Sequence, residues 1–478
     1  MASNNLETVL AKVSKEVTPS AKERKEVLSL ASSLVEKVRE AARNAGVKAK
    51  VRVEGSVAKD TWIRGEPDID IFMQVPQSML REAFGTICLN IAKEATKGSK
   101  QLERFAEHPY LETIVDGTRI NIVPCYQSKP GEWKSATDRT PFHTDYVVPR
   151  LNQRLREQIR MLKRFMKGIG VYGAEIKVGG FSGYLCELLI LQYESLVRVL
   201  EAASNFRDLW LIDYEGYDKG REDELPKIFE EPLVVVDPVD KGRNVASAVR
   251  KQSLIEFVAA SREFLKNPRQ EFFYPKQAKP LSKEKLLRVM KNRESTLFFV
   301  VVGKVKAVPD VLWGQLYKTQ RSLRKMLEQS DFQIMRDSCW SNEKDLNVLV
   351  FEVENGKLPK VKKHLGPPIS KKAECDNFLR KHIGSKETVS GPYIDNDRWV
   401  VEIKRKQNDI VKLLREKLRD GGRQGGVAEL ISKTIKRAFE VKVNQQAAKL
   451  YSSNPQFAVF LSDYLEAKPR WLKKVDGA

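Results

Sequence analysis

The sequence predicts an α+β protein of several domains: a mixed αβ head, a helical central domain, and a ferredoxin-like βαββαβ tail with C-terminal helices. Three observations support this fold class. The chain has 478 residues, enough for roughly two to four domains. Apolar residues make up 41% and charged residues 31%, which suits a soluble globular protein. Strand and helix patterns alternate early in the chain, become mostly helical, and alternate again later.

Residues 1–150 are expected to form the mixed αβ head. Two amphipathic helices come first, separated near Pro19, and the strand "AKVRVEGS" follows them. A short helical stretch through Trp62 leads into a second strand, "PDIDIFMQV", and a helix is predicted over residues 79–97. "YLETIVDGTRINIVPCY" carries Asp116-Gly117 at its centre, a dipeptide typical of tight turns, which predicts a β-hairpin.

Residues 151–275 are expected to form the helical central domain. "RLNQRLREQIRMLKRFMKGIG" predicts a basic helix that ends at a glycine. "GFSGYLCELLILQYESLVRVLEAAS" is apolar on nearly every side, so we expect a core helix. "PLVVVDPVDKGRNVA" inserts a short strand and a proline-containing turn.

The tail is predicted over residues 295–406. Its patterns follow the order strand, helix, strand, strand, helix, strand. The second helix is predicted at residues 371–383 and the last strand at residues 398–406. This is the order of the ferredoxin-like split unit. Residues 276–294 and 407–478 are expected to form a helical body, in which "DGGRQGG" is interpreted as a hinge because no Walker pattern surrounds it.

The charge balance predicts a polyanionic partner. Lys and Arg total 84 against 63 Asp and Glu, a formal charge of +21, which exceeds what solubility requires. Nucleic acid is the first candidate and an anionic membrane surface the second. No apolar run approaches the ~20 residues of a membrane span, and the N-terminus lacks a signal-peptide core, so we expect a cytoplasmic protein.

Cysteine and histidine offer no metal or redox motif. The five cysteines are scattered without a CxxC pair and mostly stand in apolar surroundings, as buried thiols in a reducing compartment do. The four histidines show no zinc-ligand spacing. The chemistry is therefore expected to rest on carboxylates.

Two carboxylates stand at alternate positions of the strand "PDIDIFMQV". Asp68 and Asp70 share one face, with Cα atoms about 7 Å apart, while Ile69 and Ile71 point into the core. Two carboxylates this close repel each other unless a cation lies between them. Mg²⁺ suits such oxygen ligands together with substrate phosphates, and a pair of these ions can activate a hydroxyl and stabilise a leaving pyrophosphate.

A Gly-Ser turn precedes the acid pair and makes a phosphate site plausible. Gly55 lets the backbone approach a phosphate, and the Ser56 hydroxyl and the free N–H groups of a helix start can hold one. Lys59 adds a positive charge one turn later. Without these surroundings, a D-x-D pattern is more often a solvated strand face.

The sequence resembles the archaeal, class I CCA-adding enzymes of the polymerase-β-like nucleotidyltransferase superfamily. Five stretches in family order carry the resemblance: "GSVAKDTWIRGEPDIDIF", "AEHPYLETIVDGTRINIVPCY", "SATDRTPFHTDYV", "GVYGAEIKVGGFSGYLCELLI" and "VVVDPVDKGRNVA". The resemblance implies a nucleotidyltransferase head and template-independent addition of C, C and A to the 3′ end of tRNA. It implies ATP and CTP as substrates and Mg²⁺ as the metal.

The resemblance also implies roles for individual residues. The residues expected to bind the nucleotide are Gly55, Ser56, Lys59, His143, Lys163, Tyr172 and Arg243. Those expected to hold the metal are Asp68, Asp70 and Asn121. Lys163 would neutralise phosphate oxygens, Tyr172 would pack on a sugar or base, and the planar Arg243 fork would read the base. Taken alone, Lys163 is more often a surface lysine, Tyr172 a core tyrosine and His143 a histidine that satisfies a loop.

Asn121 departs from the family pattern, which has a third carboxylate there. Asparagine offers a metal only a neutral oxygen and accepts no proton, so chemistry should suffer more than nucleotide binding. Asp116 lies roughly 16 Å away along the strand, and Glu112 cannot be placed from the sequence. The asparagine is either an introduced isostere that traps substrate or a natural weakening. A catalytically silent tRNA-binding protein is the alternative function.

Several basic runs predict a surface that follows an RNA backbone. They are "RLREQIRMLKRFMKG", "VKLLREKLR", "SKTIKRAFEVK" and "KPRWLKKV". The family resemblance implies that the acceptor stem and T arm of tRNA are recognised, with the tail among the binding parts. The oligomeric state stays open, a homodimer being one option.

Overall fold

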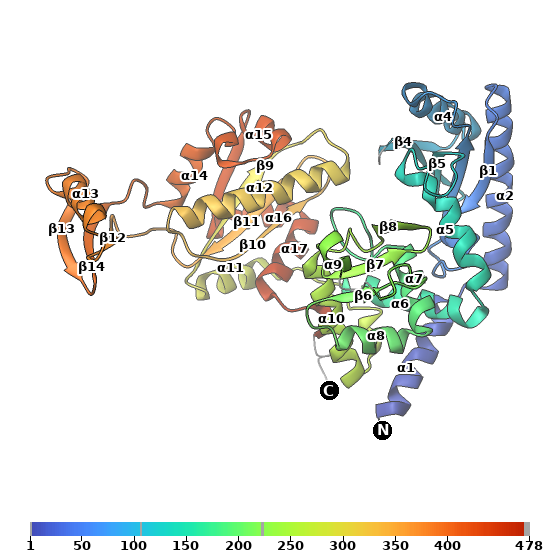
Figure 1. The fold of residues 1–478 in the computed structure, drawn as a ribbon, viewed down its shortest axis with the longest axis horizontal. Coiled ribbons are helices and arrows are strands. Elements are labelled where there is room, and N and C mark those ends of the chain that lie inside the picture. Colours follow the sequence, from blue (N-terminus) through green and yellow to red (C-terminus); the bar gives the residue numbers. More distant parts are fainter. Residues whose placement is uncertain (1, 106–107, 221–223, 473–478) are drawn as a thin grey trace. The chain divides into compact units, whose positions relative to one another are not determined.

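The computed structural model describes residues 2–105, 108–220 and 224–472, and these form two compact units (Figure 1). The first unit contains the chain up to Gln277 and again from Lys468, and the second runs from Ala278 to Ala467. None of the described helices has both the length and the apolar character needed to cross a lipid bilayer.

A five-stranded sheet organises the first part of the chain. Its strand order is β1-β2-β5-β4-β3. Only β2 and β5 run parallel; the other neighbouring pairs are antiparallel. The bounds are β1 (Lys50–Glu54), β2 (Asp68–Val75), β3 (Lys100–Phe105), β4 (Pro109–Val115) and β5 (Thr118–Tyr126). This order brings the strand of the acid pair directly beside the strand that carries Asn121.

Helices cover one face of this sheet. Following α1 (Ala2–Val17), α2 (Ala21–Asn44) packs on β1 and β2, and α4 (Arg81–Ala95) packs on β4. Ile69 and Ile71 are fully buried under these helices. Because side chains alternate along a strand, the acids between them face away from the helices. The predicted pair of N-terminal helices is confirmed, and Ser20 caps the second by accepting a hydrogen bond from the Glu23 N–H.

The predicted hairpin is confirmed in its register. Val115 pairs with Thr118, leaving Asp116 and Gly117 as a two-residue turn between β4 and β5. Both residues have positive φ, 50° and 77°, which is the conformation a tight hairpin turn of this kind requires. The turn fixes Glu112 of β4 opposite Asn121 of β5.

Helices and a small sheet complete the first unit. The helices are α5 (Thr140–Val147), α6 (Gln153–Ile169), α7 (Gly183–Tyr193), α8 (Leu196–Ser204), α9 (Leu225–Ile228) and α10 (Lys251–Lys266). The sheet has the order β6 (Trp210–Ile212), β7 (Leu233–Asp237), β8 (Asp240–Asn244). The expected core helix is buried, since every residue from Leu185 to Leu191 is buried, but it is divided into α7 and α8 at Glu194, which has a φ of 63°. Gly170, at φ 83°, ends α6 as predicted.

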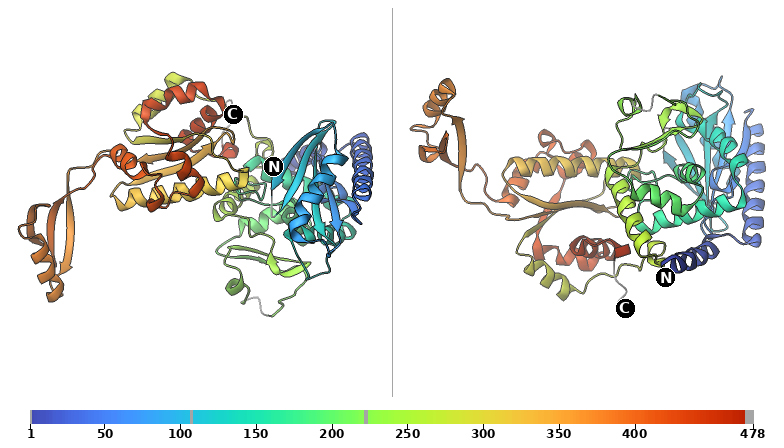
Figure 2. Two further views of the ribbon diagram at one scale, coloured as in Figure 1. Left: turned by 90° about the horizontal axis from the view of Figure 1, so that it is seen from above. Right: turned by 60° about the horizontal axis from the view of Figure 1, so that its bottom comes forward.

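The second unit contains a four-stranded antiparallel sheet of the predicted βαββαβ type. Its order is β10-β11-β9-β15, the order of a ferredoxin-like split unit. The strands are β9 (Thr296–Val302), β10 (Ile334–Ser341), β11 (Asn347–Val353) and β15 (Phe439–Val443). Figure 2 shows α12 (Pro309–Gln329) on one side of the sheet and α11 (Lys283–Asn292) with α17 (Pro455–Glu466) on the other.

The prediction of the last helix and strand of this sheet is wrong. Strand β14 (Arg398–Lys404) pairs with β12 (Val361–Pro368) and β13 (Thr388–Asp395) in a separate three-stranded sheet, on which α13 (Lys372–His382) packs (Figure 1). The four-stranded sheet is instead completed by α14 (Ile410–Leu418), α15 (Glu429–Ile435) and β15. A local strand pattern does not encode its partner, and the short, charged β15 gives a weak strand signal.

Candidate active site

The acid pair lies on the face of the head sheet opposite α2 and α4, beside Asn121. The parallel register of β2 and β5 sets Asp70 next to Asn121 and Asp68 next to Arg119. The Asn121 amide nitrogen donates to Asp70 Oδ1 at 2.9 Å. Arg119 Nε donates to Asp68 Oδ1 at 2.8 Å, and Nη2 donates to the second carboxylate oxygen. The three residues expected to hold metal therefore lie together, with an arginine among them.

Gly55 brings the predicted turn into contact with the acid pair. It opens α3 (Gly55–Ala58), with Ser56 following, and has a φ of 67°. A Cβ atom at this position would lie 2.2 Å from Asp70 Oδ2, so the turn and the acid fit together only with glycine. Burial, with the charge of Asp68 adding to it, raises the pKa of Asp70 to about 6, although the Asn121 amide opposes this.

The residues present fit a divalent cation. Burial and the neighbouring charge both disfavour ionised Asp70, and the attraction of a bound cation would offset both effects. Two carboxylates and an amide oxygen are donors that suit Mg²⁺. Within the described ranges, no three or more His, Cys, Asp or Glu side chains are placed to hold a metal ion. A third donor would therefore come from Asn121 or from the substrate.

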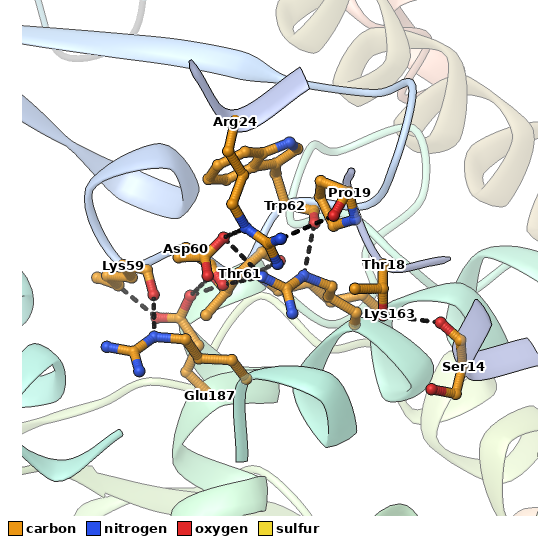
Figure 3. A network of polar contacts seen from close by, with 12 residues as sticks. Ser14, Thr18, Pro19, Arg24, Lys59, Asp60, Thr61, Trp62, Lys163 and Glu187 are labelled. Atoms are coloured by element: carbon orange, nitrogen blue, oxygen red, sulfur yellow. Dashed lines mark hydrogen bonds and ion pairs between the residues drawn. The ribbon is translucent and has the colours of Figure 1, made fainter. Parts of the chain in front are cut away.

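Lys59 and Lys163, both expected at the triphosphate, converge on one buried carboxylate, that of Glu187 (Figure 3). Lys59 Nζ donates to Glu187 Oε2 at 2.7 Å, and Lys163 Nζ donates to Oε1 at 3.2 Å. The Thr61 hydroxyl donates to Oε1 at 2.8 Å. Burial alone would raise the pKa of Glu187, but the two lysines outweigh it and lower the pKa to about 2. Glu187 thus holds both cations in place.

The segment around Asp60 joins the head to α6. Asp60 Oδ1 accepts hydrogen bonds from Arg24 Nε at 3.0 Å and from Arg160 Nη2 at 2.7 Å. Arg160 is fully buried and also donates to the Trp62 carbonyl oxygen at 3.0 Å. These contacts fix the chain between α3 and β2, where Lys59 stands (Figure 3).

Tyr172 lies close to the same lysine network. Its hydroxyl is 3.1 Å, and Lys163 Nζ is 3.6 Å, from the point that a Cβ atom on Gly183 would occupy. Gly183 is the first residue of α7 and leaves room for both groups. The Lys59 ammonium lies 5.2 Å from the centre of the Tyr184 ring, and this ring in turn stacks on His143.

His143 and Arg243 meet at Asp237. Nε2 of His143 lies 3.0 Å from Asp237 Oδ2, and Arg243 Nη1 donates to the same oxygen at 2.7 Å. Tyr184 stacks on the His143 ring at 4.0 Å and donates to Asp237 Oδ1 at 3.2 Å. Burial lowers the pKa of His143, although its contact with Asp237 acts in the other direction. The imidazole is therefore held neutral beside a buried carboxylate.

Sequence reasoning missed the carboxylates of Glu187 and Asp237 and the ring of Tyr184. A charged residue inside the apolar run "YLCELLILQY" was the one available signal for Glu187. Two predicted stretches lie partly outside the described residues: positions 106–107 of the hairpin motif and 473–475 of the last basic run.

Family models match three consecutive parts of the chain. Residues 34–143 match the nucleotidyltransferase domain, residues 157–274 the second domain of tRNA nucleotidyltransferase, and residues 293–444 the C-terminal domain of CCA-adding enzymes. With the paired acids beside a Gly-Ser turn, these matches define the class of protein: a nucleotidyltransferase of several domains.

Archaeal CCA-adding enzymes resemble the chain along most of its length. That of Methanosarcina barkeri is 34% identical over 94% of this chain and 96% of its own. That of Methanothermobacter thermautotrophicus is 35% identical over 96% and 98%, and that of Pyrobaculum neutrophilum 38% over 87% and 95%. The chain belongs to the CCA-adding enzyme family, as its motifs indicated. The solved RNA terminal uridylyl transferase Cid1 is more distant, with a TM-score of 0.43 and 17% identity over 56% of this chain and 98% of that one.

Proposed function

We propose that this chain adds C, C and A to the 3′ end of tRNA, using CTP, ATP and Mg²⁺ and no nucleic acid template. The observation that carries the proposal is the acid pair of β2 against the Gly55 turn, in a chain of this family. The 3′ hydroxyl oxygen bonds to the α-phosphorus, the bond from that phosphorus to the β-phosphate oxygen breaks, and pyrophosphate leaves as the hydroxyl proton is released.

The residues of the head would hold the metal and the triphosphate. Asp68 and Asp70, with the Asn121 amide oxygen, would hold Mg²⁺, which supplies charge stabilisation for the attacking and leaving oxygens when bound. The Ser56 hydroxyl and the N–H groups at the start of α3 face the phosphates in this proposal. Lys59 shares Glu187 with a second lysine, and in this proposal it would add a positive charge near the phosphates.

The residues of the helical part would bind the rest of the nucleotide. Lys163 and Tyr172 lie together beside Gly183 and would contact phosphate and sugar. His143 and Arg243 are both fixed by Asp237, and the Arg243 fork would read cytosine and adenine. We assign the roles of Lys163, Tyr172 and Arg243 to the central part, residues 151–275, and catalysis to residues 1–150, which also contribute His143.

Asn121 should slow the chemistry while leaving substrate binding intact. The neutral amide contributes no negative charge to the metal site and accepts no proton from the attacking hydroxyl. Its nitrogen also donates a hydrogen bond to Asp70, so one carboxylate oxygen of Asp70 is already engaged. We therefore expect Asn121→Asp to raise turnover by roughly 10²-fold or more, the usual size of a lost acid–base contribution.

The experiment extends a tRNA that ends before CCA with labelled CTP and ATP. Growth by the three missing nucleotides, slow with the protein as written and fast with Asn121→Asp, would support the enzyme. Equal rates for both forms would mean that Asn121 does not stand at the third ligand position. Tight tRNA binding without growth by either form would favour a silent tRNA-binding protein instead.

The partner surface proposed for tRNA extends beyond the nucleotide site. A formal charge of +21 suits contact with the phosphates of the acceptor stem and T arm. We assign part of this binding to the tail, residues 295–406, and the remainder to the helical body, residues 276–294 and 407–478.

A further inference from the structure

Arg119 is a cation placed by the sheet inside the candidate metal site. In the parallel register of β2 and β5, Arg119 stands directly beside Asp68, two residues before Asn121 and on the same face. Its guanidinium contacts both oxygens of the Asp68 carboxylate. The register follows from the backbone pairing of the two strands, which fixes the backbone of Arg119 beside that of Asp68.

Asn121, like Arg119, makes the metal site less negative than three carboxylates would. Its amide nitrogen donates to Asp70 Oδ1, so the third position presents a hydrogen-bond donor and no negative charge to the acid pair. The group formed by Asp68, Asp70, Arg119 and Asn121 therefore carries a net formal charge of about −1, with the acids ionised. Two divalent cations would have to bind to this single negative charge and to the substrate phosphates.

The neighbouring acid, Glu112, is already engaged. It lies directly opposite Asn121 on β4, so its side chain starts on the same face of the sheet. Its carboxylate accepts a hydrogen bond from Arg104 Nη2 at 3.0 Å, and the side chain is only 16% exposed. Asp68 and Glu112 thus each have an arginine partner, and so does Glu54, which lies opposite Asp70 on β1 and 2.6 Å from Arg52.

We propose that this site takes one divalent cation, the one that arrives with the nucleoside triphosphate, and that the Arg119 guanidinium supplies the positive charge of a second. The inference rests on the proposed function and deepens it. Arg119 offsets part of the charge of the Asp68 carboxylate, and Asp68 and Asp70 together with substrate oxygens hold the single metal ion. Restoring a two-ion site then requires both a negative charge at position 121 and removal of the arginine.

The test counts bound Mn²⁺ by electron paramagnetic resonance in the presence of saturating α,β-methylene CTP, which does not react. The full chain as written should bind one ion. Asn121→Asp combined with Arg119→Ala should bind two. Arg119→Ala alone should tighten Mn²⁺ binding about two- to fivefold, the size of a half-exposed ion pair. Arg119→Lys, which keeps the charge, should behave like the protein as written.

Lys93→Ala is the matched control. It removes a half-exposed ion pair, that of Lys93 with Glu103, from the same unit, on the helix-covered side of the sheet. Two Mn²⁺ ions bound by the unchanged protein would overturn the inference. If Glu112→Gln then lost the second ion, Glu112 would be identified as a ligand of that ion. Unchanged affinity in Arg119→Ala would also overturn it. No bound Mn²⁺ in any form would overturn the inference together with the proposed function.

Discussion

At the scale of single residues, buried carboxylates arrange the groups expected to touch the nucleotide. Glu187 is buried on α7 and holds Lys59 and Lys163 from two different elements. Asp237 does the same for His143 and Arg243. In both cases a buried carboxylate fixes the positions of the two side chains that contact it. These contacts predict that losing such a carboxylate harms both stability and nucleotide binding.

Glu187→Gln should lower the free energy of unfolding by about 3–5 kcal/mol, because it leaves two lysines buried without a counter-charge. It should also raise KM for CTP and ATP, since both lysines lose their orientation. Urea unfolding and steady-state kinetics measure the two effects. The matched control is Glu194→Gln at the end of the same helix, whose exposed pair with Arg198 should contribute less than about 1 kcal/mol. Equal stability of the two variants would show that Glu187 does not balance the lysines.

At the scale of elements, the pairing of β1 with β2 places a second unusual acid beside the site. Glu54 pairs with Asp70 across the two strands and is fully buried. Burial raises the pKa of Glu54 to about 7, and the nearby Arg52 guanidinium only partly offsets this. The ionised form is therefore unfavourable in the folded protein, which links the stability of this sheet to pH.

The sign of this linkage gives a prediction. The pKa of Glu54 is higher in the folded than in the unfolded protein, so its stabilising contribution is present below about pH 4.5 and is lost as pH rises through 7. Without nucleotide, Glu54→Gln should gain on the order of 3 kcal/mol over the unchanged protein at pH 8 and little at pH 4.5. Urea unfolding at both pH values measures the difference. Identical pH dependence in both proteins would contradict it.

The elements also show what local sequence encodes. The alternation in "PDIDIFMQV" and the Asp116-Gly117 turn are local signals, and both gave the right strand, face and hairpin. Strand β14 has an equally clear pattern but pairs with β12 and β13, and β15 takes the expected place beside β9. A few consecutive residues determine whether a strand forms, whereas the strand it pairs with depends on packing across the whole unit.

At the scale of the whole molecule, the fold class follows from the order of these patterns, while the site depends on distant contacts. Lys59 and Glu187 are 128 positions apart, and His143 and Asp237 are 94 apart. No spacing rule links such residues, so the acid pair could be found from the sequence and its supporting carboxylates could not. The acid pair, the Gly55 turn and both supporting carboxylates belong to the first unit, which therefore holds all the residues assigned here to nucleotide binding.

The most direct test of the account is an anomalous-scattering crystal structure of the full chain with CTP and Mn²⁺. We predict a metal peak at the Asp68 and Asp70 carboxylates, with the triphosphate lying along the turn from Gly55 to Lys59. A nucleotide or a metal peak bound elsewhere would contradict it.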